Sequence, residues 1–128
     1  MFSFEVRMAK KVAFEQVLEE VIELLRRRAR HPLKKTITYG DLCDLIKTRS
    51  LHPRDPELHD LLSVISTRED EAGRGLLSAI VVHSTSNRLP GDGYFILAEL
   101  RGRDVANKRV HHKAEIEKVR KANRFTNA

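Results

Sequence analysis

The stretch "GLLSAIVVHSTSNRLPGDGYFILAEL", residues 75–100, decides the fold expected for this chain. Two apolar runs, 76–82 and 94–100, flank a polar segment that contains Pro90 and Gly91. Valine, isoleucine, tyrosine and phenylalanine favour strands, and the segment between the runs is too long for a two-residue turn. The pattern predicts a β-hairpin whose loop is residues 84–93. Gly91 is expected to adopt a positive φ in that loop.

Helices are predicted on both sides of the hairpin. Apolar residues recur every three or four positions in residues 11–30, as one face of a helix requires, and His31–Pro32 ends the pattern. Thr38 is a predicted N-cap of a short second helix, and Asp55 with Pro56 begins a third. A last helix is predicted over residues 107–123. Its apolar anchors are expected at Val110, Ile116 and Val119.

This order of elements predicts an α+β fold that is mainly helical. Two short helices followed by a hairpin are typical of a winged helix, which contains a helix-turn-helix, and residues 84–93 would form the wing. We expect one domain over 1–128, with an N-terminal helix in 1–35, a winged-helix-like core in 36–100 and a basic C-terminal helix in 101–128. A small α+β domain of another kind is the alternative.

Part of this pattern resembles a known family. The segments "ITYGDLCDLI" and "GLLSAIVVHSTSNRLPGDGYF" are similar to the DNA-binding domain of alkylguanine-DNA alkyltransferases and alkyltransferase-like proteins. They also resemble an uncharacterised bacterial group with a Pro-Gly-x-Gly-aromatic loop. The resemblance implies that Tyr39 lies near a DNA backbone. It implies no alkyl transfer, because Ser78 stands at the position of the reactive cysteine.

Composition restricts the class of protein. The chain has 128 residues, one cysteine and a formal net charge of +6. A single cysteine excludes an internal disulfide framework and fits a reducing compartment. No apolar run approaches the roughly 18 residues of a membrane span. We therefore expect a cytoplasmic protein that has no membrane partner.

The positive charge is concentrated at two places in the sequence. Residues 101–128 contain nine lysines and arginines against three acids, and residues 26–35 contain six with no acid. Residues 55–71 are rich in acids instead. A localised positive surface favours binding to phosphates. The predicted nucleic-acid-binding residues are Tyr39, Ser84, Thr85, Asn87, Arg88, Arg109, Lys113, Arg120, Lys121 and Arg124.

Catalysis and metal binding find little support in the sequence. Asp92, Glu99 and Arg101 are faintly similar to a metal nuclease motif, but Asp92 belongs to a turn. The histidines and Cys43 lack zinc-site spacing, and His111 with His112 is predicted to lie on the surface. We expect no catalytic residues, no metal and no cofactor.

Two functions remain after these exclusions. The first is non-enzymatic binding of nucleic acid, with duplex DNA as the expected partner, through the 84–93 loop and the basic helix ends. The second is a protein-interaction or adaptor module that docks through the acidic helix 55–66 or the edge of the hairpin. The sequence leaves the oligomeric state and the target sequence open.

Overall fold

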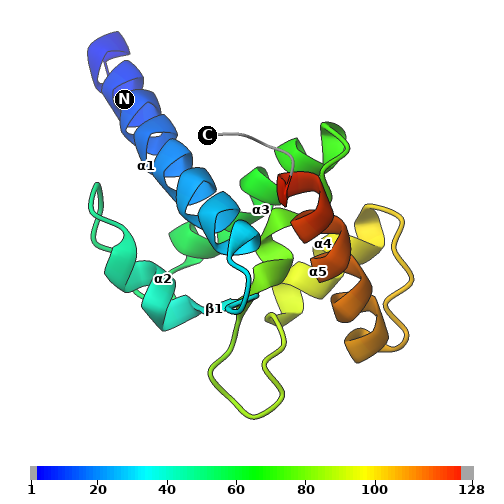
Figure 1. The fold of residues 1–128 in the computed structure, drawn as a ribbon. Coiled ribbons are helices and arrows are strands. Elements are labelled where there is room, and N and C mark those ends of the chain that lie inside the picture. The colour runs from blue at the N-terminus through cyan, green and yellow to red at the C-terminus, as the bar shows by residue number, and fades with distance from the viewer. Residues whose placement is uncertain (1–2, 125–128) are drawn as a thin grey trace.

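A computed structural model describes residues 3–124 and has the mainly helical α+β architecture expected from the sequence. These residues form five α-helices, a short 3-10 helix and a sheet of two parallel strands, and Figure 1 shows their arrangement. The elements in chain order are α1 (Phe4–Arg30), β1 (Ile37–Thr38), α2 (Tyr39–Leu45), α3 (Pro56–Glu71), η1 (Leu77–Ile80), β2 (Val81–Val82), α4 (Asp92–Leu100) and α5 (Lys108–Arg124).

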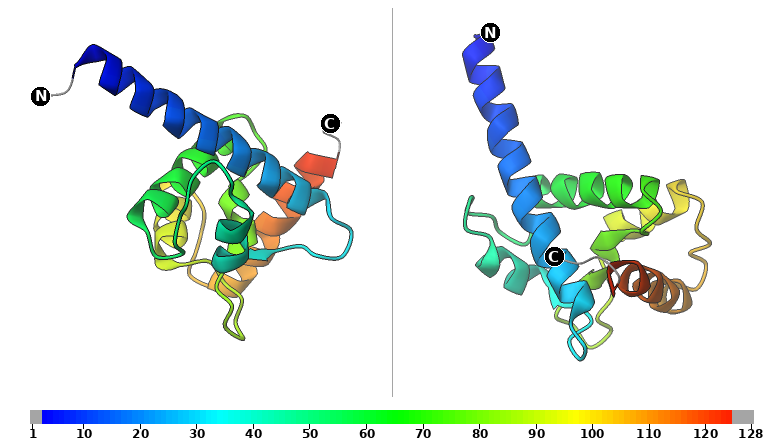
Figure 2. Two further views of the ribbon diagram at one scale, coloured as in Figure 1. Left: turned by 90° about the vertical axis from the view of Figure 1, so that its left-hand side faces the viewer. Right: turned by 45° about the horizontal axis from the view of Figure 1, so that its top comes forward.

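Helix α1 is longer than its apolar pattern predicted. Ser3 accepts a hydrogen bond from the amide of Val6, which caps a first turn that the sequence pattern had placed seven residues later. Residues 4–12 are exposed and extend beyond the rest of the molecule, as both views in Figure 2 show. The helix ends at Arg30 because Pro32 disfavours helical geometry at His31.

The predicted starts of the next two helices are confirmed. The hydroxyl of Thr38 accepts a hydrogen bond from the amide of Asp41 at the start of α2. Asp55 precedes α3 with Pro56 at the first helical position. The Asp55 carboxylate accepts from the amide of His52 instead of from the helix, so it fixes the preceding loop.

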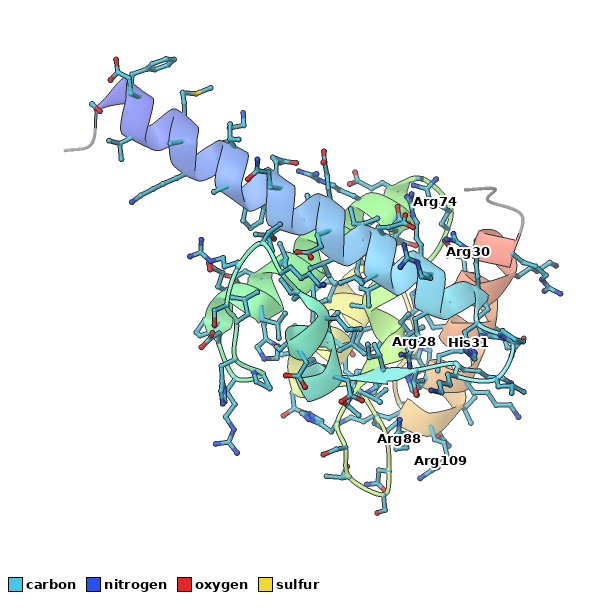
Figure 3. The ribbon with its side chains drawn as sticks, turned by 60° about the vertical axis from the view of Figure 1, so that its left-hand side comes forward. Arg28, Arg30, His31, Arg74, Arg88 and Arg109 are labelled. Carbon is cyan, nitrogen blue, oxygen red and sulfur yellow. The ribbon has the colours of Figure 1, made fainter. Side chains whose placement is uncertain are left out.

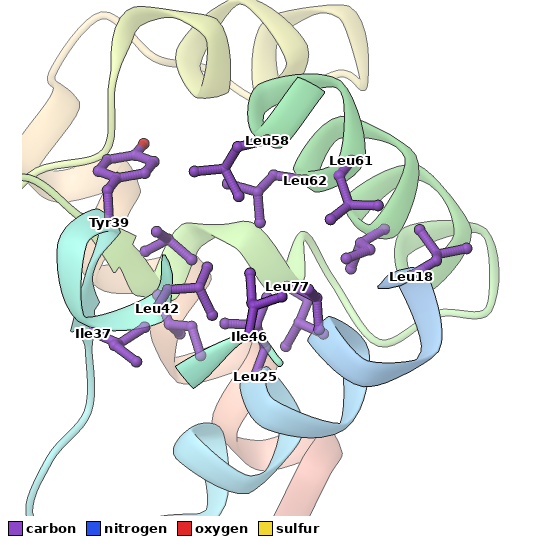
Figure 4. Packing of buried hydrophobic residues seen from close by; sticks show 14 of the residues in the cluster. Leu18, Leu25, Ile37, Tyr39, Leu42, Ile46, Leu58, Leu61, Leu62 and Leu77 are labelled. Carbon is purple, nitrogen blue, oxygen red and sulfur yellow. The ribbon is translucent and has the colours of Figure 1, made fainter. Parts of the chain in front are cut away.

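One hydrophobic cluster joins α1, α2, α3, η1 and α5. Figure 4 shows how Leu18 and Leu25 of α1 pack near Leu42, Leu61 and Leu77. All five side chains are at most 1% exposed. The N-terminal helix is therefore part of the core of residues 36–100 and not an addition to it.

The predicted β-hairpin is wrong. Residues 77–80 form a 3-10 helix, and only Val81 and Val82 continue as a strand, which pairs in parallel with Ile37 and Thr38. The second apolar run is helix α4. A short, continuously apolar run has no periodicity that separates a strand from a buried helix, and strand propensity depends on a partner strand.

Helix α4 has a helical burial pattern that the strand interpretation overlooked. Tyr94, Phe95 and Ala98 are buried, whereas Ile96 is 62% and Leu100 is 78% exposed. The buried residues form a second, smaller cluster with Leu76 and Ala79. A strand would have buried alternate residues instead.

The last helix occurs where it was predicted, but its buried face is more polar than expected. Val119 is buried as predicted, whereas Val110 is 64% exposed. The surface prediction for His111 and His112 is wrong, since both are buried. His111 Nε2 lies 2.8 Å from the Tyr94 hydroxyl and His112 Nε2 lies 2.7 Å from the carbonyl oxygen of Ala79. Burial lowers the pKa of both imidazoles.

No helix within residues 3–124 combines the length and the apolar composition that crossing a membrane requires.

Candidate nucleic-acid interface

Three hollows adjoin one another around Lys35, which lines all of them. Their volumes are about 530, 370 and 330 Å³. Their walls come from the last turn of α1 and the chain that follows it as far as Asp41, from the loop between β2 and α4, and from one face of α5. We call their basic residues the cationic surface: Arg28, Arg30, Lys34, Lys35, Arg88, Arg109, Lys113, Arg120 and Arg124. The acids in the same walls are Asp41 and Glu117.

The segment after α1 is held in a folded path by hydrogen bonds from its own side chains. The ring of His31 accepts from the amides of Leu33 and Lys34 at 3.1 and 2.8 Å. Arg28 Nη1 donates to the carbonyl oxygen of Thr36 at 2.8 Å. These bonds leave the side chains of Lys34 and Lys35 exposed beside the hollows.

Helix α5 provides the second wall. Arg109, Lys113, Arg120 and Arg124 are spaced by four or seven residues, so they share one side of the helix. Lys121 was predicted to act with them, but it lies about 100° away from Arg120 around the helix. It is exposed and lines none of the three hollows.

Arg120 has a structural role that its position in a basic run concealed. Its Nη1 donates to the carbonyl oxygens of Ala29 and His31 at 3.2 and 2.8 Å. These carbonyls lie at the C-terminus of α1, where the last turn lacks intrahelical partners and the helix dipole favours a cation. Arg120 therefore joins α5 to α1.

The loop between β2 and α4, residues 83–91, provides the third wall. Its base is closed by a bond from the His83 amide to the carbonyl oxygen of Leu89 at 2.9 Å. Ser84, Thr85, Asn87 and Arg88 are all exposed. Figure 3 shows Arg88 and Arg109 at the base of this loop, with Arg28 above them.

The backbone of the loop is strained at an unexpected residue. Arg88 has φ of 47°, and no other non-glycine residue in 3–124 has a positive φ. Gly91 has φ of −72°, so the expected positive φ at this glycine is wrong. A Cβ on Gly91 would nevertheless lie 3.3 Å from His83 Nε2 and 3.5 Å from the Tyr39 hydroxyl. Close packing, and not dihedral freedom, favours glycine at this position.

Tyr39 lies behind the loop and not on the surface. It is 7% exposed, and its hydroxyl accepts a hydrogen bond from the amide of Gly91 at 2.9 Å. The rings of His59 and His83 lie 5.5 and 5.0 Å away from its ring. Burial raises the pKa of the phenol. The structure thus gives Tyr39 the role of an anchor for the loop, where the sequence predicted a DNA contact.

A separate group of arginines is neutralised within the chain. We call it the arginine network: Arg26, Arg74, Arg101 and Arg103 with Glu69, Asp70 and Glu115. Arg103 donates to both oxygens of Asp70 at 2.7 and 2.8 Å and to Glu115 at 2.9 Å. Hydrogen bonds from Arg103 lower the pKa of Asp70 to about 2. Glu115 also accepts from the amide of Leu76 at 2.8 Å.

Gly75 allows the arginine network to approach the core. Its φ of 89° belongs to the region that favours glycine, and an added Cβ would lie 3.0 Å from Glu115 Oε2. A side chain here would displace the carboxylate that holds Arg103 and the Leu76 amide.

The surfaces proposed for an adaptor differ from the expectation. The hairpin edge does not exist, because α4 replaces the second strand. Within helix 55–66, Glu57 pairs with Arg49 at 2.6 Å, and Asp55 bonds to His52. Asp60 is exposed. Two of the carboxylates of this helix therefore already have partners within the chain.

The described residues do not form a metal centre. Between residues 3 and 124, no three histidine, cysteine, aspartate or glutamate side chains are placed to hold an ion together. Ser78 is buried, and its amide donates to the hydroxyl of Ser66 at 2.8 Å.

No protein-family model matches the chain, and no curated protein or solved structure shows significant similarity to it.

Sequence reasoning missed part of the cationic surface. Arg28, Arg30, Lys34 and Lys35 were absent from the predicted contacts, although they belong to the acid-free run at 26–35. That run was the signal that could have identified them. It could not show that Arg26 instead pairs with Glu69 at 2.8 Å.

Proposed function

We propose that this protein binds nucleic acid without catalysis, through contacts between phosphates and the cationic surface around Lys35. The observation that carries the proposal is the convergence of three segments, distant in sequence, whose basic residues line adjoining hollows with only two acids among them. A concave surface with a large excess of positive charge concentrates the electrostatic field and attracts a polyanion. Duplex DNA is the expected partner, with the loop 83–91 in the role of a wing.

The contrast with other arginines of the chain supports this proposal. Arg49, Arg68, Arg74 and Arg103 all form ion pairs with acids. Among residues 3–124, no ion pair is formed by Lys34, Lys35, Arg109 or Lys113. Neighbouring cations that outnumber the acids beside them repel one another, and a row of phosphates would remove that repulsion.

Arg88 gives independent support. A left-handed backbone conformation costs a residue with a side chain roughly 1–2 kcal/mol, and asparagine or glycine adopts it more readily. The one hydrogen bond of the Arg88 side chain, to Thr36 Oγ1, is long at 3.4 Å and compensates little. Strained residues of this kind concentrate at functional sites. An arginine at this position is therefore best explained by its charge.

Fluorescence anisotropy with a labelled duplex tests the proposal. The variant replaces Lys34, Lys35 and Lys113 by glutamine, and the matched control replaces Arg7, Lys11 and Lys47, which are exposed elsewhere. Both variants lose the same formal charge. About five phosphate contacts in the unmodified protein would make log K fall with log salt at a slope of about −4.5. The variant should lower the magnitude of that slope by about three, and the control should not change it.

The adaptor alternative predicts a different result in the same titration. An adaptor would show no affinity for duplex at physiological salt, and neither triple variant would change that. Absence of binding by the unmodified protein at low salt would therefore contradict the proposed function.

A further inference from the structure

The loop 83–91 borders two of the hollows, which also share Lys35. Arg88 lines the larger one, together with Arg28, Lys34 and Lys35. Its neighbour Asn87 lines another, together with Lys35, Arg109 and Lys113. Two adjacent residues of the loop thus line two different hollows. The molecule presents two basic hollows beside a projecting loop, which extends away from the body in Figure 1.

The outer part of the loop has a different chemistry from its sides. Residues 84–87 are Ser-Thr-Ser-Asn, all exposed, with no charge. Short hydroxyl and amide side chains form hydrogen bonds to base edges and sugars as well as to phosphates. The positive charges that suit phosphates best line the two hollows that the loop borders.

The loop is held in place before any ligand arrives. The Arg88 amide donates to the carbonyl oxygen of Thr85 at 3.1 Å, and Pro90 is buried. The Gly91 amide is bound by the Tyr39 hydroxyl, so the end of the loop is fixed to α2. A preorganised loop loses little conformational entropy when it enters a ligand.

We infer that the ligand is double-stranded, with the uncharged segment 84–87 in a groove and one phosphate backbone in each flanking hollow. This inference rests on the proposed function and specifies how the loop and the hollows would contact a duplex. A duplex groove is bordered by two backbones, which corresponds to the two basic hollows beside the uncharged segment. A single strand has one backbone and is usually held by stacking of its bases on aromatic side chains.

The aromatic residues support a double-stranded ligand. No phenylalanine or tyrosine in 3–124 lines any of the three hollows. Tyr39, Tyr94 and Phe95 are buried, and Phe4 lies at the far end of α1. The described residues of the three basic hollows thus offer no phenylalanine or tyrosine on which unpaired bases could stack.

A bulky group on the loop tests the inference. In a Cys43→Ser background, Ser86→Cys places a thiol in the uncharged segment, and Ser50→Cys places one on an exposed loop elsewhere. Each thiol is conjugated to an uncharged polyethylene glycol maleimide. Anisotropy is then measured with duplex DNA, duplex RNA and a single strand of the same sequence, and melting curves establish that each conjugate is folded.

The expected result is specific to the loop and to paired strands. The unmodified protein should prefer a duplex to the single strand, and the two duplex probes show whether DNA or RNA geometry is favoured. The conjugate at Ser86→Cys should bind that duplex about tenfold more weakly, because the attached polymer cannot enter a groove, while its single-strand affinity stays unchanged. The conjugate at Ser50→Cys should bind as the unmodified protein does.

Four outcomes overturn the inference, and one of them also overturns the proposed function. Equal affinity for duplex and single strand, or a duplex affinity that ignores the group at Ser86→Cys, contradicts the groove but leaves phosphate binding standing. A preference for the single strand likewise contradicts the groove and leaves phosphate binding standing. Failure of the unmodified protein to bind any probe at low salt removes both.

Discussion

The arginine network and the cationic surface use the same residue types for different purposes. In the arginine network, Arg103 is bound by two carboxylates that are at most 9% exposed, and it ties the 101–107 segment to α3 and α5. On the cationic surface, Lys35 and Lys113 are exposed and line one hollow with Arg109, where Glu117 is the one acid among the described residues of the wall. The difference shows that charge counts in a sequence do not reveal which cations face a ligand. The acids that each cation meets in the fold decide this.

The largest effect is expected from breaking the arginine network. Arg103→Met should lower the free energy of unfolding by about 3–5 kcal/mol, because it leaves Asp70 and Glu115 without their main cation. Urea denaturation measures the change. Arg101→Met is the control and should cost less, since Arg101 contacts Asp70 alone and its side chain is 31% exposed. Equal costs for the two variants would contradict the central place of Arg103.

Acid should weaken the same network. The pKa of Asp70 is lowered from 3.8 to about 2 in the folded protein. A lowered pKa means that the ionised carboxylate stabilises the fold above about pH 4, and that this contribution is lost as the pH falls toward 2. Melting temperatures between pH 5 and pH 2 should follow this window.

A triple variant isolates the contribution of Asp70 to that acid response. In Asp70→Asn with Arg101→Met and Arg103→Met, no carboxylate remains at position 70, and the decrease in melting temperature between pH 4 and 2 should be smaller than in the unmodified protein. The same acid response in both proteins would place the titrating group elsewhere.

A smaller effect on stability separates Arg120 from the rest of the cationic surface. Arg120→Ala should cost about 1.5–3 kcal/mol, because the carbonyls of Ala29 and His31 lose a charged donor. Lys121→Ala is the matched neighbour and should change stability by less than about 0.5 kcal/mol. Chemical denaturation of both variants checks the difference. If Arg120→Ala left the stability unchanged, Arg120 would be available to a ligand as first predicted.

The smallest effects are expected at Arg88, where one substitution should preserve or raise stability but weaken duplex binding. Arg88→Asn should leave stability unchanged or raise it by up to about 1 kcal/mol, since asparagine adopts a positive φ more readily. Duplex binding should weaken modestly for every sequence, and the magnitude of the salt slope should fall by about one. Arg88→Ala removes the same charge without relieving the backbone, so it should bind as Arg88→Asn does and be the less stable of the two. A loss of stability in Arg88→Asn would show that the arginine is kept for the fold.

Local signals in the sequence determined several elements of this protein. The spacing of Val17, Val21 and Leu25 predicted the buried face of α1, Thr38 and Pro56 predicted two helix starts, and Val119 predicted an anchor of α5. Each of these signals acts within a few residues. Helix capping and amphipathic periodicity depend on neighbours in sequence, so they can be recognised before the fold is known.

Tertiary structure alone decided the rest. Residues 94–100 became helix because Tyr94 meets His111 and Phe95 joins a cluster with Ala79, contacts that outweigh the strand propensity of Tyr-Phe-Ile. The fold likewise gives Arg103 and Arg109 different environments, although they lie only six positions apart in one basic tail. Arg103 is neutralised by carboxylates, whereas Arg109 lines a hollow. Contacts over long sequence separations determine which side chains are buried, paired or left for a ligand, and no local pattern encodes them.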